Sequence, residues 1–170
     1  TPVCAVSEAL PVGDGRCPMA AELFATMDDV YLILGEVPED EQRTDTADGR
    51  PATRPAALRR LARMLCCDVT ERDESQWLEA AEFLRQAQQV RVAAAARRVA
   101  GRLEPAPRTV VLSGEGEFVA RRVVGGCAAL ASAEVISLRD LLGANHSQAA
   151  CAYALARLAR ERIVPSATPG

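Results

Sequence analysis

The chain has 170 residues, 49% of them hydrophobic, and carries a formal net charge of −3. This size predicts one globular core, or one half of a larger one, rather than two independent domains. All 20 basic residues are arginine, which excludes a lysine Schiff base or a P-loop lysine within this chain. Because the arginines are scattered among acids, the charge pattern predicts neither a nucleic-acid nor a membrane partner.

The six cysteines indicate a reducing compartment. None forms a C-x-x-C pair, and the adjacent Cys66 and Cys67 could not form an ordinary disulfide without severe strain. With no recognisable signal peptide and no apolar run long enough to span a bilayer, the sequence predicts a cytoplasmic protein. The chain opens without methionine in the strand-like segment TPVCAV, which we interpret as the interior of a longer polypeptide.

The first third of the chain predicts a strand, a helix and a long loop. Residues 2–10 are expected to form the strand, and the glycine-bearing turn PVGDGRCP follows it. Apolar residues recur every three or four positions over 18–34, which predicts a helix with Pro18 at its first position and Gly35 just past its end. The polar stretch 36–55 is rich in proline and turn formers and is the longest predicted loop.

Two further helices are predicted in the middle of the chain. The first begins after Arg54-Pro55, ends near Asp68 and has an apolar stripe made of Leu58, Leu61, Ala62 and Leu65. The second runs over 73–101. Asp73 and Gln76 have capping-box spacing, which predicts its beginning. Its apolar positions are Leu78, Ala81, Leu84, Val92, Ala95 and Val99.

In the last third, strands alternate with helices. Strands are predicted at 109–112 and 134–137 and helices at 117–124 and 147–160, the last with Cys151, Ala154, Leu155 and Leu158 on its inner face. This alternation predicts an α/β fold with an at least partly parallel sheet. Residues 165–170 are expected to be a flexible tail.

The turn made of Ser113, Gly114, Glu115 and Gly116 is the first candidate site. A buried strand that ends in a glycine turn and leads into a helix can bring backbone amides up to a ligand. The alternative is a tight turn that needs glycine without any ligand, since the pattern is neither G-x-G-x-x-G nor a Walker A sequence. Glu115 and Glu117 suit the helix dipole but would repel a phosphate unless a metal intervenes.

The segment TDTADGRPAT contains the second candidate site. Asp45 and Asp48 are carboxylates that could share a hard cation such as Mg²⁺, and Arg50 could bind a phosphate or carboxylate through its guanidinium. The alternative is an Asp-Gly turn whose aspartates accept local backbone hydrogen bonds. His146 is the only histidine, and no catalytic triad can be assembled around it.

Three segments carry a resemblance to a known family: CPMAAELFATMDDVYLILGEVPED, TDTADGRPATRPAALRRLARMLCCD and TVVLSGEGEF, in that order. Together they resemble the hydantoinase A/oxoprolinase-like proteins of tetrahydromethanopterin-linked one-carbon transfer. Archaeal members of that group are methanofuran-biosynthesis synthases, which join an aminomethylfuran-methyl diphosphate to γ-glutamyltyramine. The resemblance covers nearly the whole chain.

The resemblance implies one half of an actin-like, ribonuclease-H-like fold of the sugar kinase, Hsp70 and actin superfamily, with additional helices. In that superfamily Ser113, Gly114, Glu115 and Gly116 would occupy the position of the adenosine motif and bind the nucleotide-like or diphosphate end of a ligand. It also implies a transferase in which Mg²⁺ assists departure of the diphosphate, with Asp45, Asp48 and Arg50 as the candidate catalytic residues. Whether ATP binds is left open, because the synthase reaction uses a diphosphate substrate.

The sequence also departs from that family. The D-I-G-G and D-x-G-S-T-T motifs that hold metal and phosphates upstream are absent. We therefore expect the chain to be the C-terminal half of a protein of about twice its length and to be inactive alone. An ATP-dependent hydantoinase/oxoprolinase-like or kinase-like enzyme and a non-catalytic assembly subunit for one-carbon enzymes remain as alternatives. The oligomeric state also stays open, with a homo-oligomer among the options.

Overall fold

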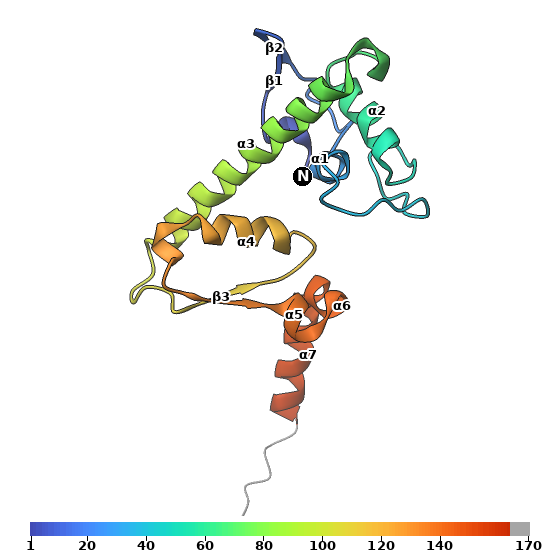
Figure 1. The fold of residues 1–170 in the computed structure, drawn as a ribbon. Coiled ribbons are helices and arrows are strands. Elements are labelled where there is room, and N and C mark those ends of the chain that lie inside the picture. The colour runs from blue at the N-terminus through green and yellow to red at the C-terminus, as the bar shows by residue number, and fades with distance from the viewer. Residues whose placement is uncertain (164–170) are drawn as a thin grey trace, which may run out of the picture. The chain divides into compact units, whose positions relative to one another are not determined.

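A computed structural model describes residues 1–163, so the predicted tail at 165–170 lies outside the described residues (Figure 1). The chain divides into an N-terminal unit, Thr1–Arg91, and a C-terminal unit that begins at Val92. The described part is mixed α/β and mostly helical, with two small two-stranded sheets. None of its helices is long and apolar enough to cross a membrane.

The predicted strand at 2–10 is wrong, because a short helix and the start of a hairpin occupy these residues. A short 3₁₀ helix, η1 (Val3–Ala5), precedes the antiparallel strands β1 (Ala9–Val12) and β2 (Gly15–Pro18). Val12 pairs with Gly15, so two residues connect the strands, and Gly13 adopts a φ of +53°. A glycine at this place supplies the left-handed backbone that a tight hairpin needs.

Helix α1 (Met27–Ile33) is shorter than the predicted helix at 18–34, because Pro18 ends β2 instead of starting a helix. Backbone amides in the intervening non-helical segment donate to carbonyls elsewhere in the chain, Met19 to Glu8 (2.9 Å) and Ala20 to Met64 (2.8 Å). The predicted stop at Gly35 is confirmed. Gly35 has a φ of +68°, and the Gly35 and Glu36 amides close a Schellman motif on the carbonyls of Leu32 and Tyr31.

Helix α2 (Arg54–Met64) packs against α1 (Figure 1) and ends earlier than the predicted Asp68, since Cys66 turns to a φ of +54°. The 3₁₀ helix η2 (Val69–Glu71) leads to α3 (Glu74–Ala100), which confirms the long helix. The predicted inner face is right at Ala81 and Leu84, which are buried, and wrong at three other positions. Leu78, Val92 and Val99 are exposed, whereas the buried side chains of the helix within the N-terminal unit are Trp77, Ala80, Ala81 and Leu84.

The C-terminal unit confirms the predicted strand–helix–strand order. Strands β3 (Thr109–Leu112) and β4 (Glu134–Ser137) are parallel, and α4 (Glu117–Gly125) and the 3₁₀ helix η3 (Ala128–Leu130) connect them (Figure 1). A small apolar core is formed by Ala100, Cys127 and Leu130, with Val110 and Val124 packed against it.

The final predicted helix at 147–160 is wrong in its limits and in its inner face. The segment forms α5 (Leu138–Leu142), α6 (Ala144–Gln148) and α7 (Ala150–Ile163), because the helical backbone is interrupted at Gly143 and Ala149. The side chains predicted to lie inside are exposed, namely Cys151, Ala154, Leu155 and Leu158. The cysteines are all unpaired.

Candidate functional site

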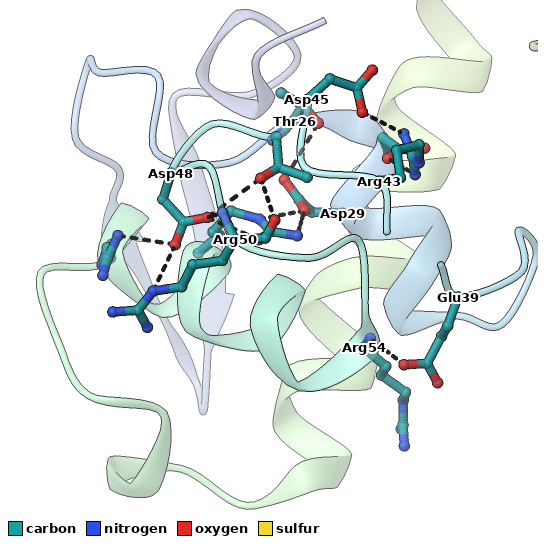
Figure 2. Close-up of polar contacts among 12 residues, drawn as sticks. Thr26, Asp29, Glu39, Arg43, Asp45, Asp48, Arg50 and Arg54 are labelled. Atoms are coloured by element: carbon teal, nitrogen blue, oxygen red, sulfur yellow. Dashed lines mark hydrogen bonds and ion pairs between the residues drawn. The ribbon is translucent and has the colours of Figure 1, made fainter. Parts of the chain in front are cut away.

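Asp48 lies in a tight turn of the long loop between α1 and α2 (Figure 2). Asp48 Oδ1 accepts a hydrogen bond from the Arg50 amide (3.2 Å), and Thr46 Oγ1 donates to the Arg50 carbonyl (2.6 Å). Gly49 between them has a φ of +68°. The interpretation of this segment as an Asp-Gly turn with local backbone bonds is therefore confirmed. The turn also fixes the direction in which the Asp48 carboxylate points.

Three arginines contact the Asp48 carboxylate (Figure 2). Arg60 Nη1 lies 3.0 Å from Oδ1, while Arg63 Nη1 and Arg50 Nε lie 3.4 Å and 3.9 Å from Oδ2. The Asp48 side chain is only 12% exposed, whereas Arg50 and Arg63 are 55% and 43% exposed. The carboxylate is therefore covered, and guanidinium groups face the solvent.

Arg60 continues the cluster into the protein interior. Its Nε donates to Asp29 Oδ1 (2.7 Å), and both side chains are buried. Asp29 Oδ2 accepts from the amide of Thr26 (2.8 Å), which is the residue that caps α1. Arg60 Nη2 also lies 2.7 Å from Asp29 Oδ1 but makes no hydrogen bond. One buried arginine thus joins the start of α1, helix α2 and the Asp48 turn.

The pKa values of the two aspartates move in opposite directions. Burial raises the pKa of Asp29 above its ordinary value of 3.8, and it outweighs the Thr26 amide and Arg60. Partial burial would also raise the pKa of Asp48, but the Arg50 amide, Arg60 and Arg63 together lower it below 3.8. Asp48 therefore stabilises the fold above pH 3.8, and this contribution is lost as the pH falls through its lowered pKa.

Asp45 is not part of the ion-pair cluster around Asp48. Its side chain is 77% exposed and pairs with Arg43 (3.6 Å), which also contacts Asp28 (2.6 Å). Within residues 1–163, no group of three or more His, Cys, Asp or Glu side chains could hold a metal ion. The two carboxylates therefore do not fit a resident Mg²⁺, and the catalytic roles of Asp45, Asp48 and Arg50 stay predictions.

The glycine turn lies in the C-terminal unit, between β3 and α4. The Gly114 amide donates to Ser147 Oγ (2.9 Å), which donates to Glu117 Oε2 (3.2 Å). Glu117 is only 4% exposed, and its Oε1 has no hydrogen-bond partner among the described residues. The predicted strand–turn–helix arrangement is confirmed, whereas ligand binding by the turn formed by Ser113, Gly114, Glu115 and Gly116 stays a prediction.

The two glycines of this turn differ in what a side chain would cost. Gly114 has a φ of +90°, which L-residues rarely adopt, while Gly116 does not have a positive φ. A Cβ added at Gly116 would meet no atom within 4 Å. Alanine at Gly116 therefore tests contact with a ligand without straining the backbone.

Sequence reasoning missed Asp29, Arg60 and Arg63. The signal that could have indicated the two arginines is their spacing of three residues, which places them on one face of a helix. No sequence pattern links Arg60 to Asp29, because 31 residues separate them. The contact exists only because α1 and α2 pack together.

Comparison with known proteins adds one observation. The Methanocaldococcus jannaschii (4-{4-[2-(gamma-L-glutamylamino)ethyl]phenoxymethyl}furan-2-yl)methanamine synthase is 25% identical over 163 residues, which is 96% of this chain and 47% of the synthase. The chain is a distant relative of this synthase.

The protein of the same name from Methanococcus vannielii is 31% identical over 71 residues, which is 42% of this chain and 32% of that protein. No family model matches. The chain spans less than half the length of both synthases.

Proposed function

We propose that the chain belongs to an enzyme that forms the aryl ether described in its relatives' name. In this reaction the phenol oxygen of γ-glutamyltyramine is joined to the methylene carbon of an aminomethylfuran-methyl diphosphate. The observation that carries the proposal is the 25% identity to the Methanocaldococcus jannaschii synthase, which extends over 96% of this chain. An actin-like fold of the intact enzyme is part of the same proposal.

The reaction sets clear chemical demands. A C–O bond forms between the phenol and the furan methylene, the C–O bond to the diphosphate breaks, and the phenol proton passes to an acceptor. The site must therefore stabilise negative charge on the departing diphosphate and accept a hydrogen bond from the phenol. No step here depends on a metal held by the protein, and Mg²⁺ would arrive with the diphosphate as part of the substrate.

The cluster around Asp48 supports this assignment. Arg50 is half-exposed and can bind the diphosphate, and its Nε lies 3.9 Å from the Asp48 carboxylate. Asp45 is well exposed and is our candidate for the acceptor of the phenol proton. Asp48 is the weaker candidate for that role, because arginines surround it and lower its pKa.

The glycine turn favours a different part of a ligand. The buried carboxylate of Glu117 next to it disfavours a bare phosphate and favours a group that donates hydrogen bonds, such as an amine or a hydroxyl. A nucleotide ribose has such hydroxyls. This arrangement keeps an ATP-dependent enzyme as the second candidate, with Ser113, Gly114, Glu115 and Gly116 at the nucleotide.

The test is a calorimetric titration of the protein in its natural full length with the furan-methyl diphosphate and with ATP, each with and without Mg²⁺. Product formation with γ-glutamyltyramine is followed by mass spectrometry. We expect binding of the diphosphate and formation of the aryl ether without ATP. Selective ATP binding that Gly116→Ala abolishes would instead support the ATP-dependent enzyme, and no binding of either would favour an assembly subunit.

A further inference from the structure

We propose that Arg63 and Arg50 together form a two-armed binding site for the diphosphate group, with Asp48 as the residue that holds them in register. This inference rests on the proposed function and adds a residue, Arg63, and a geometry to it. The ligand chemistry is that of an inorganic or organic diphosphate.

The geometry brings two arginines from separate elements to one point. Arg50 comes from the loop turn and Arg63 from the last turn of α2, yet one nitrogen of each lies within 4 Å of the same atom, Asp48 Oδ2. These two nitrogens are therefore no more than about 7 Å apart. A single diphosphate can bridge such a pair, because its two phosphoryl groups each present several acceptor oxygens.

The charges favour an anion at this place. The cluster contains three arginines, Arg50, Arg60 and Arg63, and two aspartates, Asp29 and Asp48. Asp29 and Arg60 are buried and pair with each other, so two arginines and one aspartate remain toward the surface. A net positive charge results, and it is carried by the exposed groups rather than by the covered ones.

Stability alone does not require this arrangement. Arg60 already gives Asp48 a buried partner at 3.0 Å, and exposed ion pairs contribute little to folding. Each exposed guanidinium contacts Asp48 through one nitrogen, so most of its five N–H donors point elsewhere. Guanidinium groups bind phosphoryl oxygens through paired N–H donors, which is the use that the exposed arms allow.

The chain provides a matched control on the same helix. Arg59 is exposed on α2, four residues before Arg63, and makes no ion pair within the described part of the chain. Arg59→Gln therefore removes the same charge from the same helix without touching Asp48. Any loss of binding that Arg63→Gln shares with Arg59→Gln reflects general surface charge.

The experiment is a calorimetric titration of the natural full-length protein with inorganic pyrophosphate, with orthophosphate in a second arm. We expect Arg63→Gln and Arg50→Gln each to weaken pyrophosphate binding about 10-fold or more, Arg59→Gln less than about 2-fold, and Arg63→Lys to restore part of the affinity. Orthophosphate should bind more weakly than pyrophosphate, because it carries less negative charge and offers fewer acceptor oxygens to the two arginines. Circular dichroism of each variant confirms that the fold is intact.

The outcomes separate this inference from the proposed function. The two-armed site would be overturned if Arg59→Gln and Arg63→Gln lost pyrophosphate affinity equally. It would also be overturned if the natural protein did not bind pyrophosphate, even if the aryl ether still forms. Pyrophosphate binding that depends on Arg50 and Arg63 in a protein that makes no ether would support the site while the proposed synthase activity fails. Equal affinity for orthophosphate would overturn the preference for a diphosphate.

Discussion

The two units of the chain bury their side chains to different degrees. In the N-terminal unit, Trp77, Leu61 and Ile33 are each at most 1% exposed, and even the ion pair of Arg60 and Asp29 is buried. In the C-terminal unit the buried apolar residues of the described part are Ala100, Leu112, Val123, Cys127 and Leu130. Large aliphatic side chains there face the solvent, with Leu155 69% and Leu141 68% exposed.

This difference indicates two ways of holding a fold together. Burial of apolar area contributes roughly 25 cal/mol per Å², so the first unit can depend on its core. In the second unit, backbone hydrogen bonds of the helices and of the two-stranded parallel sheet contribute a larger share of the stability. Val111 of that sheet is 56% exposed. Parallel sheets are normally covered on both faces. We expect substitutions of similar size to cost more in the first unit than in the second.

The largest effect is expected for Trp77→Ala. Trp77 is buried and its indole Nε1 donates to the Val69 carbonyl (3.0 Å), so the change removes both apolar contacts and a hydrogen bond. We expect the free energy of unfolding to fall by about 3–5 kcal/mol, measured by urea denaturation followed by circular dichroism. Val90→Ala, at a position 66% exposed on the same helix, should change it by less than about 0.5 kcal/mol. Equal effects of the two would contradict the assigned core.

Arg60→Met should lower the free energy of unfolding by nearly as much, because it leaves Asp29 buried without its partner. Removal of one member of a buried ion pair costs about 3–5 kcal/mol. The double variant Arg60→Met/Asp29→Asn should recover part of the loss, since no charge then remains buried. Arg63→Met, at an exposed arginine of the same helix, should cost less than about 1 kcal/mol. Denaturation curves of the natural protein, Arg60→Met, Asp29→Asn and the double variant form the double-mutant cycle, and additive losses would show that Arg60 and Asp29 do not interact.

Local signals in the sequence predicted much of the fold. Gly35 ends α1 as expected, and the long helix at 74–100 and the strands β3 and β4 lie where the patterns placed them. These features depend on residues close together in the sequence. Gly35 adopts the left-handed conformation that ends α1, and the Asp73 amide donates to Gln76 Oε1 (3.0 Å) at the start of α3.

Features that depend on distant partners could not be predicted. Residues 19–25 are not helical, and the Ala20 amide donates to the carbonyl of Met64, 44 positions along the chain. Of the candidate site, the Asp48 turn was visible in the sequence, whereas Arg60 and Asp29 meet only through packing of α1 on α2. The exposed face of α7 has the periodicity of a buried helix, and nothing in the described part of the unit covers it.

Glu117→Gln tests how a buried carboxylate affects the stability of the C-terminal unit. Glu117 is buried with one oxygen unpartnered, and Arg139 lies 4.0 Å from the other. Glutamine keeps the acceptor for Ser147 and removes the buried charge, so we expect stability to be unchanged or to rise by about 1 kcal/mol. Hydrogen exchange of peptides that cover β3 and α4 measures this unit separately. A loss above about 1 kcal/mol would mean that the carboxylate charge has a partner in solution.

The smallest effect is expected for Leu155→Gln. Leu155 is 69% exposed on α7, and an exposed position of this kind usually tolerates a polar residue within about 0.5 kcal/mol. Hydrogen exchange of α7 gives the measurement, and Leu158→Gln, 55% exposed on the same helix, repeats it at a second position. A loss above about 1.5 kcal/mol at both positions would mean that this face is covered in solution. The C-terminal unit would then depend on apolar burial as the N-terminal unit does, and the contrast between them would be smaller than the described residues indicate.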